Sequence, residues 1–473
     1  MKSRTTLSNY SVYALLFLLP LIVYHALAGF EFLTAWDDGW MVFNRHTTDG
    51  LGLPNLADIA SETNQGQYSP VNQLIYTILH SIFGLDPLAF HLMSVLYHAI
   101  NTCLVYAFVK ALLGLREREN VKMISTTAFI SAILFAVHPM NIEAISWISA
   151  SKIPLYTLFG LSALISYMRY LKTGKLGIYA LSFVLFVFAF LCKEQGCIIP
   201  IAALFIDWYA RRNFRDKKIW LEKIPFLAII VCGGLYTLSL RNIGWIEHYV
   251  GFPMWQRLVF ASYSITEYLT KLIVPTNLMY IYPFPMMPGA PLPHRFLIYP
   301  VIFAALAGAA IYFRKYKLMV FGALFFLLNL ALTLHIISMS RISIVSDRYV
   351  YLSSIGFFMP AVWYGVNYVM RLSKGKRIFV CVLFGAYLFY LTGYTMKHVE
   401  VWENNDTLKK DVKELLEKRK IEEQKHVVPK DSISEMGMGT YRRFLETLRA
   451  TSLRKGEDKD VGCTERKADG TSA

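Results

Sequence analysis

Long apolar runs recur along this chain of 473 residues, and they constrain its fold more than any other feature. About 20 consecutive apolar residues let a helix span the ~30 Å hydrocarbon core of a bilayer. Charged residues make up only 17% of the chain, whereas a soluble domain has about 25%. The strands of about ten residues with alternating hydrophobicity that are typical of a membrane β-barrel are not visible. The sequence therefore predicts an all-α polytopic membrane protein.

Basic residues gather in short segments between the apolar runs, and they predict the topology. Cytoplasmic loops carry an excess of Lys and Arg, so the N-terminus and segments such as 116–122 and 211–218 should be cytoplasmic. Any two of these segments must be separated by an even number of crossings. This parity predicts eleven transmembrane helices, at 11–30, 87–113, 123–139, 153–171, 177–192, 196–210, 222–240, 296–313, 318–337, 351–370 and 378–396. The net charge of +15 then reflects membrane topology and not nucleic-acid binding.

Two further apolar stretches, 70–84 and 256–273, carry polar or charged side chains that disfavour a crossing. We expect each to form an amphipathic helix at the interface, in the first and fourth outer loops. Residues 1–396 would then form the transmembrane domain. A charged helix at 397–425 on the outer side and a polar, disordered tail at 426–473 would follow it.

Two adjacent carboxylates, Asp37 and Asp38, follow the first apolar run in the string TAWDDGW. Adjacent carboxylates beside a low-dielectric membrane raise each other's pKa unless a cation or a hydrogen-bond donor balances them. A general base, or a site in which Asp38 binds a divalent cation, could use such a pair. Helix capping by one of the two is the structural alternative, although a cap needs only one carboxylate.

Further ionisable side chains lie near the outer ends of the predicted helices. They are His138, Glu143, Lys152, Lys193, Glu194, Arg341, Asp347 and Arg348. Ionisable groups at membrane depth are costly and indicate a function. The structural alternatives are that single cations extend to the lipid headgroups, that Lys193 and Glu194 form a structural ion pair, and that His138 has a packing role.

Several strings around these residues resemble a known family of membrane glycosyltransferases. They are WDD at 36, YSPVNQL at 68, FHLMSVLYHA at 90, LFAVHPMNIEAISWI at 134, LCKEQG at 191 and SDRYVYLSSIGF at 346. The chain resembles the transmembrane-and-tetratricopeptide-repeat O-mannosyltransferase-like proteins, which have the GT-C glycosyltransferase superfold. It departs from them at Ser69, where the family has Arg, and at 151–153, where the family has Arg-Ala-Asp. No repeat of about 34 residues follows residue 397, as in a bacterial-type relative without the repeats.

The resemblance implies transfer of a sugar, such as mannose, from a polyprenyl-phosphate carrier to an acceptor. The acceptor would be a protein hydroxyl or an envelope glycan or lipid, on the outer face of a bacterial inner membrane. Asp37 would be the general base, with Asp38 supporting it. The donor phosphate would be held by Lys193 and Arg348, and more weakly by Lys152 and Arg341. His138, Glu143, Glu194 and Tyr351 would support the site.

Three other functions remain open from the sequence. An O-antigen polymerase or ligase also has many helices and outer-face Arg residues, but has no evident need for the WDD string. A transporter would favour helices broken at mid-membrane and internal repeats, whereas the ionisable residues here gather at one face. A noncatalytic scaffold that keeps the fold is the third.

Overall fold

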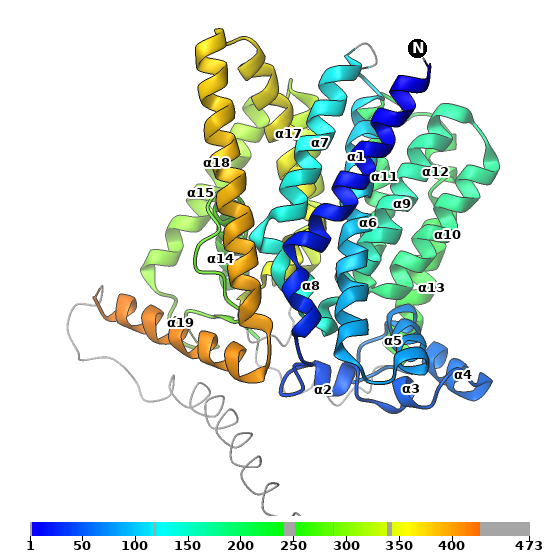
Figure 1. The fold of residues 1–473 in the computed structure, drawn as a ribbon, viewed down its shortest axis with the longest axis vertical. Helices are drawn as coiled ribbons and strands as arrows, with labels where there is room; N and C mark the ends of the chain where they lie inside the picture. The colour runs from blue at the N-terminus through cyan, green and yellow to red at the C-terminus, as the bar shows by residue number, and fades with distance from the viewer. Residues whose placement is uncertain (1, 118–119, 241–250, 287, 338–342, 426–473) are drawn as a thin grey trace, which may run out of the picture.

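A computed structural model describes residues 2–117, 120–240, 251–286, 288–337 and 343–425, which form a bundle of helices (Figure 1). The long helices are α1 (Lys2–Val23), α6 (Pro87–Leu113), α7 (Val121–Val137), α9 (Lys152–Thr173), α10 (Leu176–Cys192), α11 (Ile199–Tyr209), α13 (Ile224–Leu240), α15 (Ile298–Tyr312), α16 (Lys317–Leu330), α17 (Val350–Met370) and α18 (Lys374–His398). Each overlaps one of the stretches predicted to cross the membrane. The predicted all-α fold class is confirmed.

Several of these helices have the length and composition of membrane spans. Within the described ranges, five helical segments are long and apolar enough to cross, or up to six if the bent pair Val121–Val137 and Pro139–Ser146 is one span. Shorter apolar helices occur at Tyr10–Val23, Leu176–Cys192 and Lys317–Thr333. The chain is therefore a multi-pass membrane protein. The number of eleven crossings and the cytoplasmic N-terminus stay predictions.

Glycines allow α16 and α17 to approach each other closely. A Cβ atom on Gly356 would lie 2.5 Å from the carbonyl oxygen of Gly322 and 2.8 Å from the backbone nitrogen of Phe326. Small residues allow two backbones to approach in this way, and dispersion contacts along the helices then stabilise the pair. Gly174, with φ of +66°, ends α9 in the left-handed conformation and lets the chain turn into α10.

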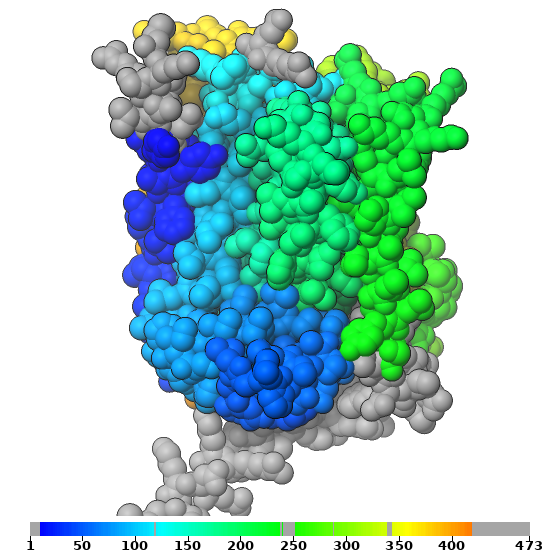
Figure 2. Space-filling view, turned by 90° about the vertical axis from the view of Figure 1, so that its right-hand side faces the viewer, coloured from blue at the N-terminus to red at the C-terminus, as the bar shows by residue number. Residues whose placement is uncertain are grey.

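One end of the bundle is covered by the segment between α1 and α6. It contains α2 (Asp38–Met41), α3 (Arg45–Thr48), α4 (Leu53–Ser61) and α5 (Pro70–Phe83). Figure 2 shows this blue segment as a rounded cap beneath the long helices. The two stretches predicted as interfacial helices are both helical, as α5 and as α14 (Met254–Ile273). Their position relative to a bilayer stays a prediction.

The chain after α18 returns to the capped end of the bundle. A short helix, η9 (Val399–Trp402), leads into α19 (Asn405–Lys425), which lies at the same end as α2 (Figure 1). A short antiparallel pair, β1 (Tyr282–Pro283) and β2 (Ser343–Val345), precedes α17. The predicted disordered tail, 426–473, lies outside the described residues.

Candidate active site

The two carboxylates of the acidic pair have different surroundings. Asp38 is fully buried and accepts hydrogen bonds from the backbone N–H groups of Leu33 and Ser149, both at 2.9 Å, and from the Ser149 hydroxyl. Ser149 belongs to η3 (Ile148–Ala150), so Asp38 ties the segment after α1 to the segment before α9. Burial raises the pKa of Asp38 from 3.8 to about 6. Asp38 therefore positions the loop that carries its neighbour.

Asp37 is half-buried and is the accessible member of the pair. It is the N-cap residue of α2, but its side chain accepts no capping hydrogen bond. Its Oδ1 atom accepts a long hydrogen bond of 3.3 Å from Nε1 of Trp40. Because neither carboxylate serves as a helix cap, capping does not account for the pair.

Lys152 lies within electrostatic range of Asp37, Lys193 and Glu194, which come from distant parts of the chain. Lys152 is the first residue of α9, and its ammonium group interacts electrostatically with Lys193, Glu194 and Asp37. Lys193 directly follows α10, and Glu194 begins η4 (Glu194–Ile198). The Lys152 ammonium group also donates a hydrogen bond to Oε1 of Gln67 in the cap segment. The structure therefore brings together four of the residues that the sequence analysis singled out.

Glu143 and Arg348, both singled out from the sequence, form an ion pair. Glu143 lies on α8 (Ile142–Ser146) and is 3% exposed, whereas the side chain of Arg348 in η8 (Asp347–Tyr349) is 20% exposed. The backbone N–H of Arg348 donates to Oε2 of Glu143 at 2.7 Å, and its guanidinium group pairs with Oε1. The same guanidinium group lies over the rings of Trp147, at 5.2 Å, and Tyr349, at 4.8 Å. The charge of Arg348 is thus balanced by a buried carboxylate.

An aromatic cluster, which we call the Tyr280 cluster, consists of Trp36, Trp147, Tyr280 and Trp402. The Tyr280 ring lies edge-on to Trp36 at 4.7 Å, to Trp147 at 5.2 Å and to Trp402 at 5.6 Å. Such edge-to-face contacts add to the stability gained from burying the rings. The Nε1 atoms of Trp36 and Trp147 are buried without a hydrogen-bond partner in the described part of the chain. The cluster therefore presents two unused donors.

The Tyr280 cluster connects the acidic pair to the ion pair. Burial raises the pKa of Tyr280 well above its ordinary value, and the charge of Asp37 raises it further, so its hydroxyl stays protonated. Arg348 and Glu143 also act electrostatically on this hydroxyl. Tyr280 thus lies between the predicted base and the Glu143–Arg348 pair.

Residues at the start of α19 fix the loop in front of Asp37. The side-chain oxygen of Asn405 accepts a hydrogen bond from the backbone N–H of Ala35 at 3.0 Å, and its amide nitrogen donates to Oγ1 of Thr34 at 3.2 Å. The backbone N–H of Glu31 donates to the carbonyl oxygen of Glu403 at 2.9 Å. The acidic pair is therefore held from two sides, by Ser149 through Asp38 and by the chain after α18.

Two predicted supporting residues, His138 and Tyr351, are hydrogen-bonded inside the helix core. The His138 Nδ1 atom accepts from the backbone N–H of Met140, and its Nε2 atom faces the carbonyl oxygen of Leu272, both at 3.2 Å. The Tyr351 hydroxyl bonds to Nδ1 of His98 at 2.8 Å. Their supporting role stays a prediction. Arg341, predicted to bind phosphate, lies outside the described residues.

A divalent cation at Asp38 does not fit this arrangement. Divalent cations need carboxylate oxygens that are free to coordinate, and both oxygens of Asp38 already accept hydrogen bonds from the protein. Within the described ranges, no group of three or more His, Cys, Asp or Glu side chains could hold a metal ion. The divalent cation therefore stays a prediction, and the described residues offer no set of side chains that would coordinate it.

Sequence reasoning missed Tyr280, Ser149 and Asn405 as parts of the site. Trp147 and Trp402 also contribute, and Trp147 lies in the string LFAVHPMNIEAISWI, which resembles the family. Tyr280 lies in an aromatic-rich segment without such a string. Ser149 and Asn405 act through contacts across 111 and 370 positions of sequence, which no local pattern indicates.

Comparisons with known proteins agree with the motifs. Residues 67–236 match the family described as dolichyl-phosphate-mannose-protein mannosyltransferase. A protein O-mannosyl-transferase of Caenorhabditis elegans is 26% identical over 280 residues, which cover 56% of this chain and 38% of that protein. One of Drosophila melanogaster is 27% identical over 241 residues (46% and 25%), and a human one is 29% identical over 171 residues (34% and 18%). The matched part thus covers no more than 38% of the length of these relatives.

Proposed function

We propose that this chain is a membrane glycosyltransferase. The proposal follows from its relationship to the protein O-mannosyl-transferases, which agrees with the resemblance of its motifs. The chain moves a sugar from a polyprenyl-phosphate carrier to an acceptor hydroxyl on the non-cytoplasmic face. The observation that carries the proposal is the meeting of Asp37 with Lys152, Lys193 and Glu194 at one end of the bundle. The names of the relatives make mannose the first sugar to test and a protein hydroxyl the first acceptor.

Asp37 acts as the general base in this proposal. Its carboxylate takes the proton of the acceptor hydroxyl while the hydroxyl oxygen forms a bond to the anomeric carbon of the sugar. The bond between that carbon and the phosphate oxygen breaks, and polyprenyl phosphate leaves with the electron pair. A single displacement of this kind inverts the anomeric configuration. General base catalysis typically contributes ~10²–10⁴-fold in rate.

Lys152 and Lys193 hold the phosphate that leaves. Negative charge develops on this group as the sugar is transferred, and preorganised cations stabilise such charge most in a site with little water. Lys152, within electrostatic range of both the base and Lys193, satisfies that requirement together with Lys193, and Glu194 limits the repulsion between the two lysines. Arg348 is a further candidate, although its charge is already paired with Glu143.

Asp38 supports the base by holding it in place. Its hydrogen bonds to Leu33 and Ser149 fix the backbone on either side of the acidic pair. Rigid support matters because a misplacement of ~1 Å at a reacting group can lower a rate about 100-fold. The buried Nε1 donors of Trp36 and Trp147 in the Tyr280 cluster would bind hydroxyl groups of the sugar or the acceptor.

Binding of the carrier tests the lysine assignment. The full chain, purified in detergent, would be titrated with a polyprenyl-phosphate mannose. Lys152→Gln and Lys193→Gln should each weaken binding by about tenfold or more, because each removes a charge-assisted hydrogen bond. Lys413→Gln, on the exposed side of α19 at the same end of the molecule, is the matched control and should bind as the wild type does. Unchanged affinity in both site variants would contradict the assignment.

A further inference from the structure

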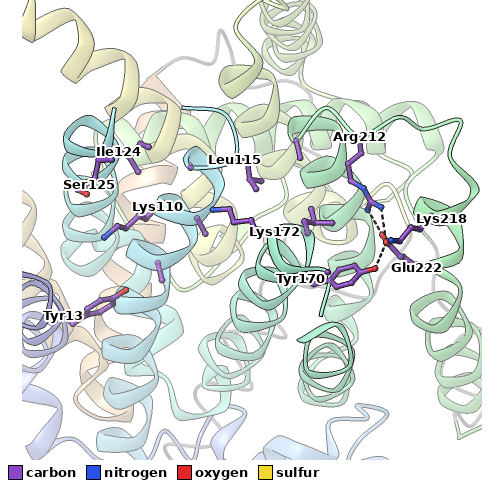
Figure 3. Close-up of a pocket in the computed structure, with 17 residues that line it drawn as sticks. Tyr13, Lys110, Leu115, Ile124, Ser125, Tyr170, Lys172, Arg212, Lys218 and Glu222 are labelled. Carbon is purple, nitrogen blue, oxygen red and sulfur yellow. Dashed lines mark hydrogen bonds and ion pairs between the residues drawn. The ribbon is translucent and has the colours of Figure 1, made fainter. Parts of the chain in front are cut away.

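A cavity of about 1000 Å³, whose lining is drawn in Figure 3, lies among helix ends that are at the opposite end of the bundle from α2 in Figure 1. The ends of α6 and α9, the start of α7 and the short helix α12 (Lys217–Leu221) surround it, and α1 contributes Tyr13. In Figure 3, Lys110 and Tyr13 lie on one side, Arg212 and Lys218 lie on the other, and Lys172 lies between them. None of these residues takes part in the proposed transfer reaction.

Positive charge dominates the lining of this cavity. Four lining side chains are cationic, and one, Glu222, is anionic. The cationic side chains are Lys110, Lys172, Arg212 and Lys218. Cations that converge on one cavity favour an anionic ligand, and phosphate oxygens accept the hydrogen bonds that Lys and Arg donate.

Arg212 and Glu222 belong to a balanced ionic network in the wall of the cavity. The Arg212 guanidinium group donates to Oε2 of Glu222 at 2.5 Å and to Oδ1 of Asp207 at 2.9 Å. The Lys223 ammonium group donates to Oδ2 of Asp207 at 2.8 Å, and the Tyr170 hydroxyl donates to Oε1 of Glu222 at 2.9 Å. Two cations thus balance two carboxylates. The excess positive charge of the cavity comes from its three lysines.

The other part of the lining is apolar. Ala107, Ala111, Leu115, Val121, Ile124 and Leu171 contribute to it. Gly114 lies beside two of the lysines, because a Cβ atom there would lie 3.1 Å from the carbonyl oxygen of Lys110 and 3.6 Å from Nζ of Lys172. A soluble anion would contact only the charged part of this lining. An anionic lipid matches both parts, because it has a charged headgroup and an apolar tail. Basic side chains at the cytoplasmic membrane surface attract anionic lipid headgroups.

We propose that this cavity, at the end of the bundle that the basic segments predict to be cytoplasmic, binds the phosphate headgroup of an anionic phospholipid. Lys110, Lys172 and Lys218 hold the phosphate, and the Arg212–Glu222 pair forms a fixed wall beside them. The acyl chains leave along the apolar lining beside Tyr13, which is 37% exposed on α1. The lipid binds at the opposite end of the bundle from the proposed transfer site.

Native mass spectrometry of the full chain tests this proposal with short-chain phosphatidylglycerol as the probe. The combined variant Lys110→Gln, Lys172→Gln and Lys218→Gln should weaken binding at least about tenfold, because charge-assisted hydrogen bonds are lost. Ala111→Phe, which fills the cavity and keeps its charge, should weaken binding as well. The control Lys374→Gln with Lys376→Gln removes two exposed cations at the start of α18 and should bind within about twofold of the wild type.

Inorganic phosphate and phosphatidylcholine distinguish the sources of the phosphate group. A site for an anionic lipid should bind phosphatidylglycerol in preference to zwitterionic phosphatidylcholine, and millimolar inorganic phosphate should not displace the lipid. If inorganic phosphate displaces phosphatidylglycerol when the two are present at equal concentration, the cavity is a site for a soluble phosphate, and the lipid assignment is overturned. Equal binding by the three-lysine variant and the wild type would overturn the proposal as a whole.

Discussion

Breaking the Glu143–Arg348 ion pair should destabilise the protein strongly. The loss should depend on which of the two residues is substituted. Glu143 is 3% exposed, so Arg348→Gln leaves a buried carboxylate without its cation. Removing one partner of a buried ion pair typically costs about 3–5 kcal/mol. Glu143→Gln leaves a cation that is 20% exposed, and the rings of Trp147 and Tyr349 still face it, so its cost should be smaller, about 1–3 kcal/mol.

A double-mutant cycle measures the interaction itself. In the variant with both substitutions, neither charge is left buried and alone, so the loss should be smaller than the sum of the two single losses by about 2 kcal/mol or more. Reversible unfolding of the purified chain in mixed micelles gives the free energy of unfolding of each variant. The exposed pair of Arg45 and Asp58, with side chains 53% and 38% exposed, is the matched control, and its coupling should be about 0–1 kcal/mol.

The cycle has a clear refutation. If the Glu143 and Arg348 substitutions are additive within about 0.5 kcal/mol, the two side chains do not share a buried ion pair. The argument that the charge of Arg348 is already balanced would then fail, and Arg348 would rank with Lys152 and Lys193 as a principal phosphate-binding residue.

Three further predictions concern the acidic pair and the topology. Because burial raises the pKa of Asp38 from 3.8 to about 6, the folded protein binds the extra proton between these values. The contribution of this group to the free energy of unfolding should therefore fall by about 3 kcal/mol in total as the pH rises from well below ~4 to well above ~6, and Asp38→Asn should remove that part of the pH dependence. Asn405→Ala removes two hydrogen bonds to the loop before Asp37, so the transfer rate should fall about tenfold with carrier affinity unchanged; an unchanged rate would show that the contact is dispensable. Cysteines introduced at residues 116 and 215 should resist an impermeant thiol reagent in intact cells, and labelling there would refute the predicted orientation.

The long helices could be predicted from the sequence because hydropathy is a local property. Each of the eleven stretches predicted to cross overlaps a helix, and the interfacial candidates at 70–84 and 256–273 are α5 and α14. The short helices α2 to α4 escaped prediction, since they have too few turns for a hydrophobic period to show. The bend between α7 and η2 (Pro139–Asn141) follows from Pro139, because proline removes a backbone donor and disfavours a helical residue before it.

Individual residues of the site were easier to predict from the sequence than the contacts between them. Ionisable residues at apolar boundaries are recognisable in a sequence, and Glu143 and Arg348 were found in this way. Their pairing across 205 positions is a tertiary contact, which no spacing reveals. The different roles of Asp37 and Asp38 also depend on a distant residue, Ser149, which donates hydrogen bonds from its backbone N–H and its hydroxyl to the carboxylate of Asp38.

The ionic network of Asp207, Arg212, Glu222 and Lys223 was missed for a different reason. Arg212 lies in the basic segment 211–218, whose Lys and Arg content already explains the predicted topology, so no carboxylate partner was expected for it. The structure shows that Asp207 on α11 and Lys223 before α13 are buried and paired. Arg212 thus belongs both to the basic segment that predicts the topology and to the ionic network, and only the three-dimensional structure reveals the second role.

Sugar transfer by the purified chain tests the central claim most directly. Wild-type protein would be incubated with polyprenyl-phosphate mannose and a peptide rich in Ser and Thr, and the peptide mass and the anomeric configuration of the product would be determined. We expect a mass increase of one hexose with inverted configuration, which Asp37→Asn reduces by ~10²–10⁴-fold while folding and carrier binding persist. Asp49→Asn, an exposed carboxylate on the same segment, should transfer as the wild type does. Transfer by Asp37→Asn at the wild-type rate would contradict the account.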